Sequence, residues 1–179
     1  MLTERLIIRR FRPSDVAAFA AYRNDPEVAR YQSWSTPFEW EAAQRLVAIF
    51  AGADPEEPGW FQYALESQVD GVLVGDVAVN LADNRMQAEI GFTLAPAFQG
   101  QGFAVEAVDR MLEHLFRDRG LHRVSAECDA RNLSSAKLLE RLGFTREGLR
   151  RQHTWIKGEW TDDLLYGLLA EDWRRRRPA

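Results

Sequence analysis

A glycine-rich segment in the middle of the chain has the residue types and spacing to bind an anion. It spans Gln99–Ala104 (QGQGFA), between a strand-like run over residues 88–94 and a helical pattern over residues 103–118. The first N–H groups of a helix lack partners within the helix, and the helix dipole adds partial positive charge there. Glycines let phosphate oxygens approach the backbone. The segment predicts a phosphate-binding loop; a plain turn between a strand and a helix is the alternative.

Two common phosphate loops do not fit this segment. The P-loop requires a lysine directly after its last glycine, and Gly102 is followed by Phe103. The dinucleotide fingerprint requires a third glycine where this chain has Val105. What remains is the pattern Q-x-x-G-x-A.

Hydrophobic spacing predicts the elements that must position the loop. Apolar residues at 105, 108, 112, 115 and 116 fall on one face of a helix. Upstream, residues 60–66 and 72–81 read as two strands of a hairpin that turns at Asp70–Gly71. Adjacent strands before the long helix imply an antiparallel section, and the helices after it imply crossovers. We therefore expect an α/β (α+β) fold with a mixed central sheet.

The remaining elements follow from the same rules and from capping residues. At the N-terminal end we expect a strand over residues 5–11 and a helix over 13–23, broken at Asn24-Asp25-Pro26. A second helix is expected from Thr36–Pro37 to Gly52, because threonine is a good N-cap and proline a good first residue. At the C-terminal end we expect a strand over residues 121–128, a helix over 132–142 and a hairpin of residues 150–157 and 159–169.

Length and composition bound the class of protein. The 179 residues suffice for one domain with a substantial core, and 46% of them are hydrophobic. Cys128 is the single cysteine, so no disulfide framework is expected and a reducing compartment is favoured. The N-terminus reads as neither a signal peptide nor a membrane span. We expect a cytoplasmic protein without a membrane partner.

The charge is unevenly distributed. The formal net charge is −4, and removing the four arginines at 174–177 leaves 19 basic against 27 acidic residues, or −8. An acidic body disfavours nucleic acid and mildly favours cationic partners. We therefore expect one domain over residues 1–173 and a basic C-terminal tail over 174–179, solvated or, alternatively, in contact with RNA or ribosomes. The three histidines lack ligand spacing, so no metal site is expected.

Four segments in order resemble the GNAT acyltransferase superfamily, and within it the branch of ribosomal-protein N-terminal acetyltransferases of the RimJ/RimL type. They are residues 3–9 (TERLIIR), residues 89–92 (EIGF) with the loop at 99–104, Asn132 and Ser135 followed by residues 142–144 (LGF), and residues 158–162 (GEWTD) followed by Tyr166.

The resemblance implies the GNAT fold, with a splayed strand at the acyl-CoA site. It also implies acetyl-CoA as the donor and a primary amine as the acceptor. Backbone N–H groups of the loop would hold the CoA pyrophosphate. The residues carried over to the cofactor site are Gln99, Gln101, Gly102, Phe103, Ala104, Asn132 and Lys137. Asn132 as a helix cap only, and Lys137 as a solvated residue only, remain alternatives.

The chemistry requires a proton acceptor, because amines are mostly protonated near pH 7. The resemblance assigns that role to Glu89, against the alternative of a glutamate on an exposed strand face. Many GNAT enzymes carry a tyrosine where this chain has Leu139, so Ser135 is the hydroxyl available near the sulfur; local capping is its alternative role. Direct attack needs no enzyme nucleophile, so Cys128 is expected in the core.

The sequence leaves the identity of the acetyl acceptor open. Tyr31, Trp34 and Trp155 are candidates for an acceptor wall, although aromatics of this kind also form core or the surface of a homodimer. A protein N-terminus and a small, cationic amine both fit. The leading hypothesis is an acetyl-CoA-dependent N-acetyltransferase that works through a ternary complex. The alternative is an acyl-CoA-binding or sensing domain without turnover, supported only by Leu139.

Overall fold

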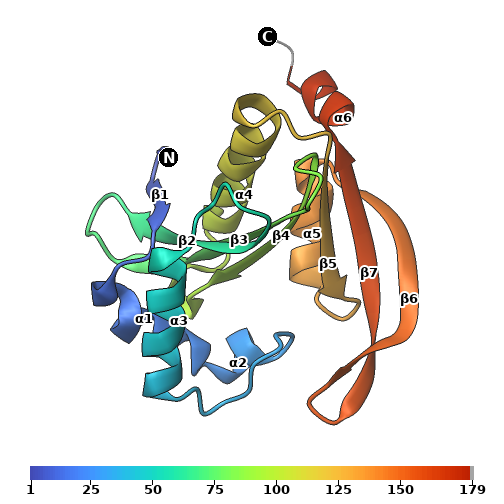
Figure 1. Ribbon diagram of the computed structural model, residues 1–179. Helices are drawn as coiled ribbons and strands as arrows, with labels where there is room; N and C mark the ends of the chain where they lie inside the picture. Colours follow the sequence, from blue (N-terminus) through green and yellow to red (C-terminus); the bar gives the residue numbers. More distant parts are fainter. Residues whose placement is uncertain (178–179) are drawn as a thin grey trace.

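A computed structural model describes residues 1–177 and shows one seven-stranded sheet with helices on both faces (Figure 1). The strands are β1 Leu6–Arg10, β2 Gly59–Ser67, β3 Leu73–Leu81, β4 Gln87–Leu94, β5 Arg123–Asp129, β6 Thr145–Ile156 and β7 Glu159–Leu169. The helices are α1 Val16–Arg23, α2 Pro26–Ala29, α3 Trp40–Gly52, α4 Phe103–Glu113, α5 Leu133–Leu142 and α6 Ala170–Arg175; 3-10 turns span Pro13–Asp15 and Pro96–Phe98, and His114–Asp118 extends α4 as a π-helix.

The sheet is mixed, as the sequence predicts. Its strand order is β1-β2-β3-β4-β5-β7-β6. The first four strands are antiparallel, β5 runs parallel to β4, and β7 and β6 are again antiparallel. The single parallel contact, β4 to β5, is made possible by the crossover through α4.

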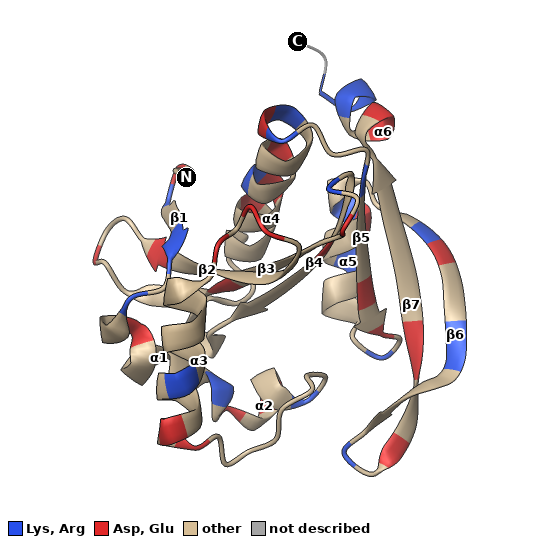
Figure 2. Ribbon diagram, viewed as in Figure 1, with Lys and Arg blue, Asp and Glu red and all other residues tan. Residues whose placement is uncertain are grey.

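Two separate groups of buried side chains hold the helices on opposite faces of the sheet. On one face, α4 and α5 bury Val108, Leu112 and Leu139 against the larger core cluster. On the other face, α1–α3 pack over Ala64 of β2 and Leu73 of β3. Beyond that cover, β5, β6 and β7 carry charged residues along their length (Figure 2).

The structure corrects the expected start of the second long helix. That helix, α3, begins at Trp40, with Glu39 as its N-cap, instead of at Thr36–Pro37. The reason lies in Asn24 at the end of α1, whose side chain exchanges two hydrogen bonds with the backbone of Phe38, at 2.7 and 2.9 Å. These bonds hold the segment before α3 in a non-helical conformation.

Two short helices were not predicted. Helix α1 ends at Arg23, as expected, with Asn24 as its C-cap. The carboxylate of Asp25 then accepts hydrogen bonds from the N–H groups of Glu27 and Val28 and caps the one-turn helix α2. Aspartate followed by proline therefore starts a new helix after the break. The other unpredicted helix is α6, at the C-terminal end.

The terminal arginines lie against the body of the protein. Arg174 and Arg175 form the last turn of α6, and an Nη of Arg176 donates to the carbonyl of Arg141 at 3.2 Å. Arg177 forms an ion pair with Asp109 of α4. Residues 178 and 179 of the predicted tail lie outside the described residues. Within residues 1–177, none of the helices combines the length and apolar composition needed to cross a membrane.

Candidate active site

The sheet opens between β4 and β5. These strands pair through only three register partners, the last of which is Glu89 with Ser125. Beyond them, residues 90–94 of β4 and 126–129 of β5 make no ladder with each other. Unpaired strand edges leave backbone N–H and C=O groups for a ligand. The splayed strand implied by the resemblance is therefore present, with Glu89 at the closed end of the wedge.

The glycine-rich loop lies at the open end of this wedge, directly after β4. Gly100 and Gly102 have φ values of +72° and +85°, which favour glycine, and Gly102 is the N-cap of α4. The side chains of Gln99 and Gln101 fix the loop by donating to the carbonyls of Leu94 and Ala97, at 3.0 and 2.6 Å. The first N–H groups of α4 thereby point toward the wedge, and this geometry suits the binding of an anion.

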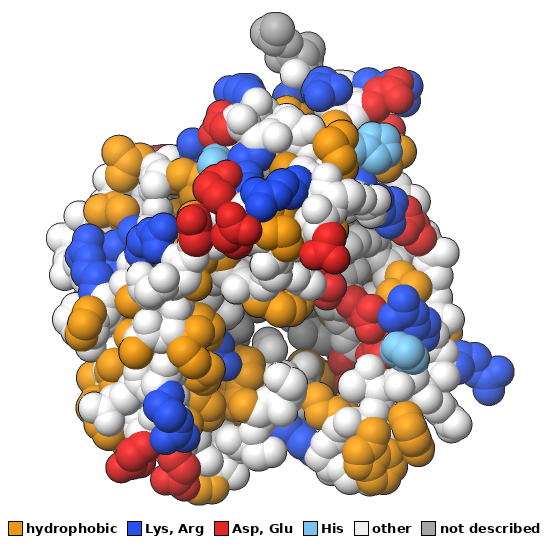
Figure 3. Space-filling model, viewed as in Figure 1, with side chains coloured by type: hydrophobic (Ala, Val, Ile, Leu, Met, Phe, Trp, Pro, Cys, Tyr) orange, Lys and Arg blue, Asp and Glu red, His pale blue; other side chains and the backbone are white. Residues whose placement is uncertain are grey.

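A cavity of about 580 Å³ joins the loop to the helix that follows β5. Its volume falls in the range typical of small-molecule sites. Of the predicted site residues, it brings together Gln99, Gly102, Ala104, Asn132, Ser135, Lys137 and Tyr31. Figure 3 shows a hollow on the face of the molecule between the side of α1–α3 and the β6–β7 hairpin.

Gln101 and Phe103 do not line the cavity; they anchor the loop to the N-terminal segment. Arg5 donates from Nη1 to the carbonyl of Gln101 at 3.0 Å, and its guanidinium lies 4.1 Å from the ring centroid of Phe103. Arg5 itself is held by Glu106, whose carboxylate accepts from Nε of Arg5 at 2.7 Å and from the hydroxyl of Thr3. Glu106 thus supports the loop.

The roles of Arg5 and Thr3 were missed, although both lie in a segment that carried the resemblance. Burial opposes ionisation of Glu106, but hydrogen bonds from Thr3 and Arg5 and the charge of Arg5 outweigh it and lower the pKa of this carboxyl. Its contribution to stability is therefore present above the ordinary glutamate pKa and is lost as the pH falls through the lowered one.

We expect Glu106→Gln to lower the free energy of unfolding by about 1–3 kcal/mol, because it weakens a charge-assisted hydrogen-bond group. We also expect weaker binding of CoA, because Arg5 would lose the group that holds it against the loop. Urea unfolding and titration calorimetry measure the two effects. The control is Glu113→Gln on the same helix, where the partners are Arg110 and Arg117. Equal effects of both variants on CoA affinity would contradict the role of Glu106.

Asn132 caps α5, as expected, and it also faces the cavity. Its Oδ1 accepts the N–H of Ser135 at 3.2 Å. Within residues 1–177 its Nδ2 has no hydrogen-bond partner, so the amide can cap the helix and donate to a ligand together. The first turn of α5 also carries Ser135, half-buried at the cavity wall, and the next turn carries Lys137, which is exposed.

Two residues near this turn are unsuited to direct chemistry. Leu139 is 1% exposed in the core, so its side chain is out of reach of a ligand in the cavity. Burial and then the nearby carboxylates of Asp129, Asp163 and Glu127 raise the pKa of Cys128 to about 11. A thiol that stays protonated near neutral pH is a poor nucleophile, in agreement with the expectation that Cys128 only packs.

Glu89 lies on the sheet face opposite α4, half-buried. Its neighbours Ala88 and Ile90 point into the core on the α4 side. Burial, followed by the charge of Glu127, raises the pKa of Glu89, while Arg150 opposes this shift. A carboxylate with a raised pKa at the closed end of the wedge has the properties of a general base.

The three aromatic candidates lie in different places. Tyr31 lines the cavity, and Arg131 lies 5.9 Å from its ring centroid. Trp34 packs on Arg23 and donates from Nε1 to the Arg23 carbonyl, which places it in the second core cluster. Trp155 is 59% exposed near the tip of the β6–β7 hairpin, paired edge-to-face with Trp160. Neither tryptophan lines the cavity.

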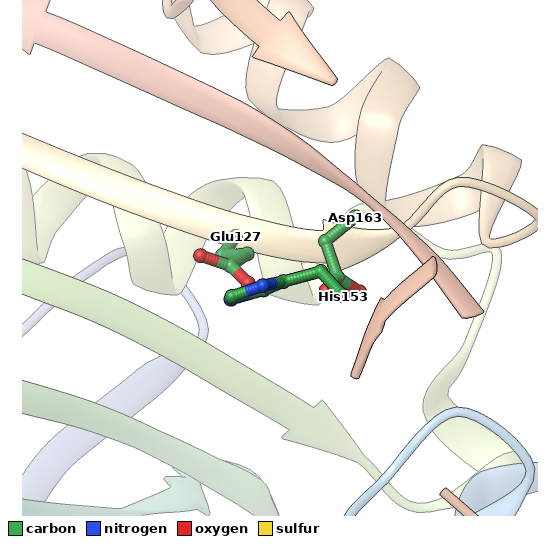
Figure 4. A group of neighbouring side chains, drawn as sticks. All are labelled: Glu127, His153 and Asp163. Carbon is green, nitrogen blue, oxygen red and sulfur yellow. The ribbon is translucent and has the colours of Figure 1, made fainter. Parts of the chain in front are cut away.

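A polar cluster on the open face of the sheet was not predicted. Glu127, His153 and Asp163 come from β5, β6 and β7, with their ligand atoms within 4.8 Å of one another (Figure 4). These residue types suit a metal ion. However, Nη1 of Arg150 already lies 3.0 Å from Glu127 Oε2 and 3.2 Å from His153 Nε2. As it stands, the cluster is an ion-pair network around Arg150.

Comparison with known proteins agrees with this geometry. Residues 5–145 match the acetyltransferase (GNAT) domain family. The chain is 31% identical to the uncharacterized N-acetyltransferase p20 of Bacillus licheniformis, over 97% of each chain. It is 26% identical to the [ribosomal protein uS5]-alanine N-acetyltransferase of Escherichia coli, over 97% of this chain and 92% of that one.

A solved structure is similar over almost the whole chain. It is an acetyltransferase of the GNAT family from Bacillus anthracis, with a TM-score of 0.87 and 28% identity, covering 96% of this chain and 98% of that one. The family uses acetyl-CoA. This chain belongs to the GNAT acetyltransferase family and is an N-acetyltransferase.

Proposed function

We propose that the protein transfers an acetyl group from acetyl-CoA to a primary amine by direct attack in a ternary complex. The observation that carries the proposal is the cavity between the loop and α5, because it joins an anion-binding helix N-terminus to a wedge with unpaired backbone groups. The bound donor supplies the activated acetyl thioester. The loop N–H groups would hold its pyrophosphate, and Asn132 and Lys137 would contact it along α5.

Within this proposal, Glu89 takes the proton that the amine loses. Its place at the closed end of the wedge and its raised pKa support this role. Ser135 is the hydroxyl that can protonate the leaving thiolate, because it lies in the cavity wall on the first turn of α5. Backbone N–H groups along the unpaired edge of β4 can stabilise the oxyanion.

For the acceptor we propose a protein N-terminus or a small cationic amine. The relative from Escherichia coli is named for acetylating an alanine of a ribosomal protein. The open sheet face next to Glu89 carries the exposed carboxylate of Glu127, which suits a positively charged acceptor. The relatives are named N-acetyltransferases, which favours an enzyme over a domain that only senses acyl-CoA.

The first test is the thermal stability of the protein with acetyl-CoA, CoA or ATP. A ligand that binds only the folded state stabilises it by about 2.7 kcal/mol at a hundredfold excess over its dissociation constant. We expect both CoA species to raise the melting temperature and ATP to leave it unchanged. If neither acetyl-CoA nor CoA raises the melting temperature, the assignment of the loop as the donor site is wrong.

The second test supplies acetyl-CoA and follows the release of free thiol. Acceptors would include spermidine and a peptide that begins with alanine. The same peptide with an acetylated N-terminus is the control, because it differs only in the reacting amine. Turnover with the free peptide alone identifies N-terminal acetylation, and turnover with spermidine alone identifies a small-amine enzyme.

A further inference from the structure

The ion-pair network around Arg150 lies beside the residue that we propose as the base. On β5, Val124 and Ala126 point into the α4 core, so the alternation of the strand directs Glu127 to the opposite face. Glu89 lies on that same face and pairs in register with Ser125, two residues before Glu127. The two carboxylates therefore flank the wedge, Glu89 at its closed end and Glu127 farther along the opposite strand.

A bulge in β6 brings Arg150 and His153 to this place. The β6–β7 register shifts between Arg150, opposite Asp163, and Thr154, opposite Thr161. Gln152, within the bulge, has a φ of +46°. Extra residues in one strand of a pair re-aim its side chains, and bulges of this kind gather near active sites. Here Arg150 contacts both the carboxylate of Glu127 and the ring of His153.

The two carboxylates are not equivalent. Arg150 donates from Nη1 to Oε2 of Glu127, whereas within residues 1–177 the carboxylate of Glu89 has no hydrogen-bond partner. One oxygen of Glu127 is therefore engaged by a guanidinium, whereas both oxygens of Glu89 are free to meet a ligand. The bonded carboxylate suits the role of charge partner, and the free one suits the role of base.

We propose that Glu127 binds the ammonium group of the acceptor and that Arg150 is a positioning residue that fixes the Glu127 carboxylate for this task. This rests on the proposed acetyl transfer. The ammonium lies between the two carboxylates, and its proton passes to the free carboxylate of Glu89. The products of this step are the neutral amine and protonated Glu89, so atoms and charge balance. Oε1 of Glu127 remains for the acceptor while Arg150 holds Oε2.

The charged groups that act on Glu89 are few. Glu127 from β5 raises its pKa beyond the effect of burial, and Arg150 from β6 opposes the shift. The register partner of Glu89 on β3 is Asn80, which is uncharged. Asp163 from β7 and His153 from β6 lie next to Glu127. Glu127 and Arg150 thus shift the pKa of Glu89 in opposite directions, so substitutions of these two residues should have opposite effects on its titration.

The test follows the titration of Glu89 by carbon NMR of the full-length protein with labelled glutamate carboxyls. Glu127→Gln removes a negative charge and should lower the titration midpoint of Glu89, by roughly one pH unit; Arg150→Gln should raise it by a similar amount. The matched controls are Glu147→Gln and Arg151→Gln, both exposed on β6. These should leave the midpoint unchanged. An unmoved midpoint in both test variants, or a shift of the same sign in both, overturns the proposal.

Steady-state kinetics provide the second measurement. The acidic limb of the kcat/KM profile should move in the same direction as the NMR midpoint in each variant. Glu127→Gln should raise KM for the acceptor at least tenfold with little change in KM for acetyl-CoA, and Glu127→Asp and Arg150→Lys should restore part of the loss. An unchanged acceptor KM in Glu127→Gln overturns the binding role. If the midpoints shift as expected but no amine is acetylated, the proposed function fails while the coupling between the carboxylates stands.

Discussion

Replacing Glu89 by glutamine is expected to lower the rate of acetyl transfer by about 10²–10⁴-fold, the usual contribution of a positioned general base. Glutamine keeps the size and the hydrogen-bonding ability of the side chain, but it cannot accept the proton of an ammonium group. Glu89 is half-buried and lies outside the cavity that contains the loop, so neither folding nor the affinity for CoA should change much.

The pH dependence separates this role from a structural one. Burial and the charge of Glu127 raise the pKa of Glu89, so the wild-type rate should fall as the pH drops through that raised value. Glu89→Gln has no such group and should follow the ionisation of the amine alone. An N-terminal amine has a pKa of about 8, so the advantage of the wild type should shrink above that pH.

The measurement is the pH profile of kcat/KM for wild type, Glu89→Gln and Glu89→Asp, with CoA binding followed by calorimetry. Aspartate keeps the charge but withdraws it by one methylene group, so we expect an intermediate rate with the acidic limb retained. Full activity of Glu89→Gln at all pH values would show that another group, or water, takes the proton.

The sequence allowed the sheet and the loop to be predicted because their signals are local. Period-two and period-3.6 patterns identify strands and helices within a few residues, and Gly102 marks the left-handed position that starts α4. The wedge between β4 and β5 leaves no such local signal. It arises where two strands stop pairing, which depends on the rest of the sheet, and only the family resemblance indicated it.

The supporting contacts could not be read from the sequence for a related reason. Glu106 and Arg5 are separated by 101 residues and meet through the packing of α4 on β1. Likewise, Arg150 and His153 reach Glu127 only because β6 bulges, and strict alternation would have placed the two on opposite faces. Asn24 is a further example of a contact that the sequence does not reveal. Its hydrogen bonds with Phe38 make α3 start later than Thr36, although Thr36 is a good N-cap by local rules.

Gly102→Ala is expected to remove about half of the stabilisation by acetyl-CoA, at a modest cost to the free protein. At a φ of +85° an alanine is strained by about 1–2 kcal/mol. A Cβ at this position would make only an ordinary contact, at 3.4 Å from Nη2 of Arg5, so the strain lies in the backbone of the loop. The loop relieves it by a change of φ at residue 102, which turns the first N–H groups of α4 away from the donor site.

Gly120→Ala is the matched control for this variant. Gly120 has a φ of +69°, a Cβ there would meet nothing within 4 Å, and the residue does not line the cavity. Both variants should therefore unfold at similarly lower temperatures without ligand. At a concentration that stabilises the wild type by about 2.7 kcal/mol, a tenfold weaker affinity would leave Gly102→Ala with only about 1.4 kcal/mol, while Gly120→Ala keeps the full effect. Equal ligand-induced shifts in the two variants would mean that the anion site depends on side chains such as Lys137 and not on the backbone of the loop.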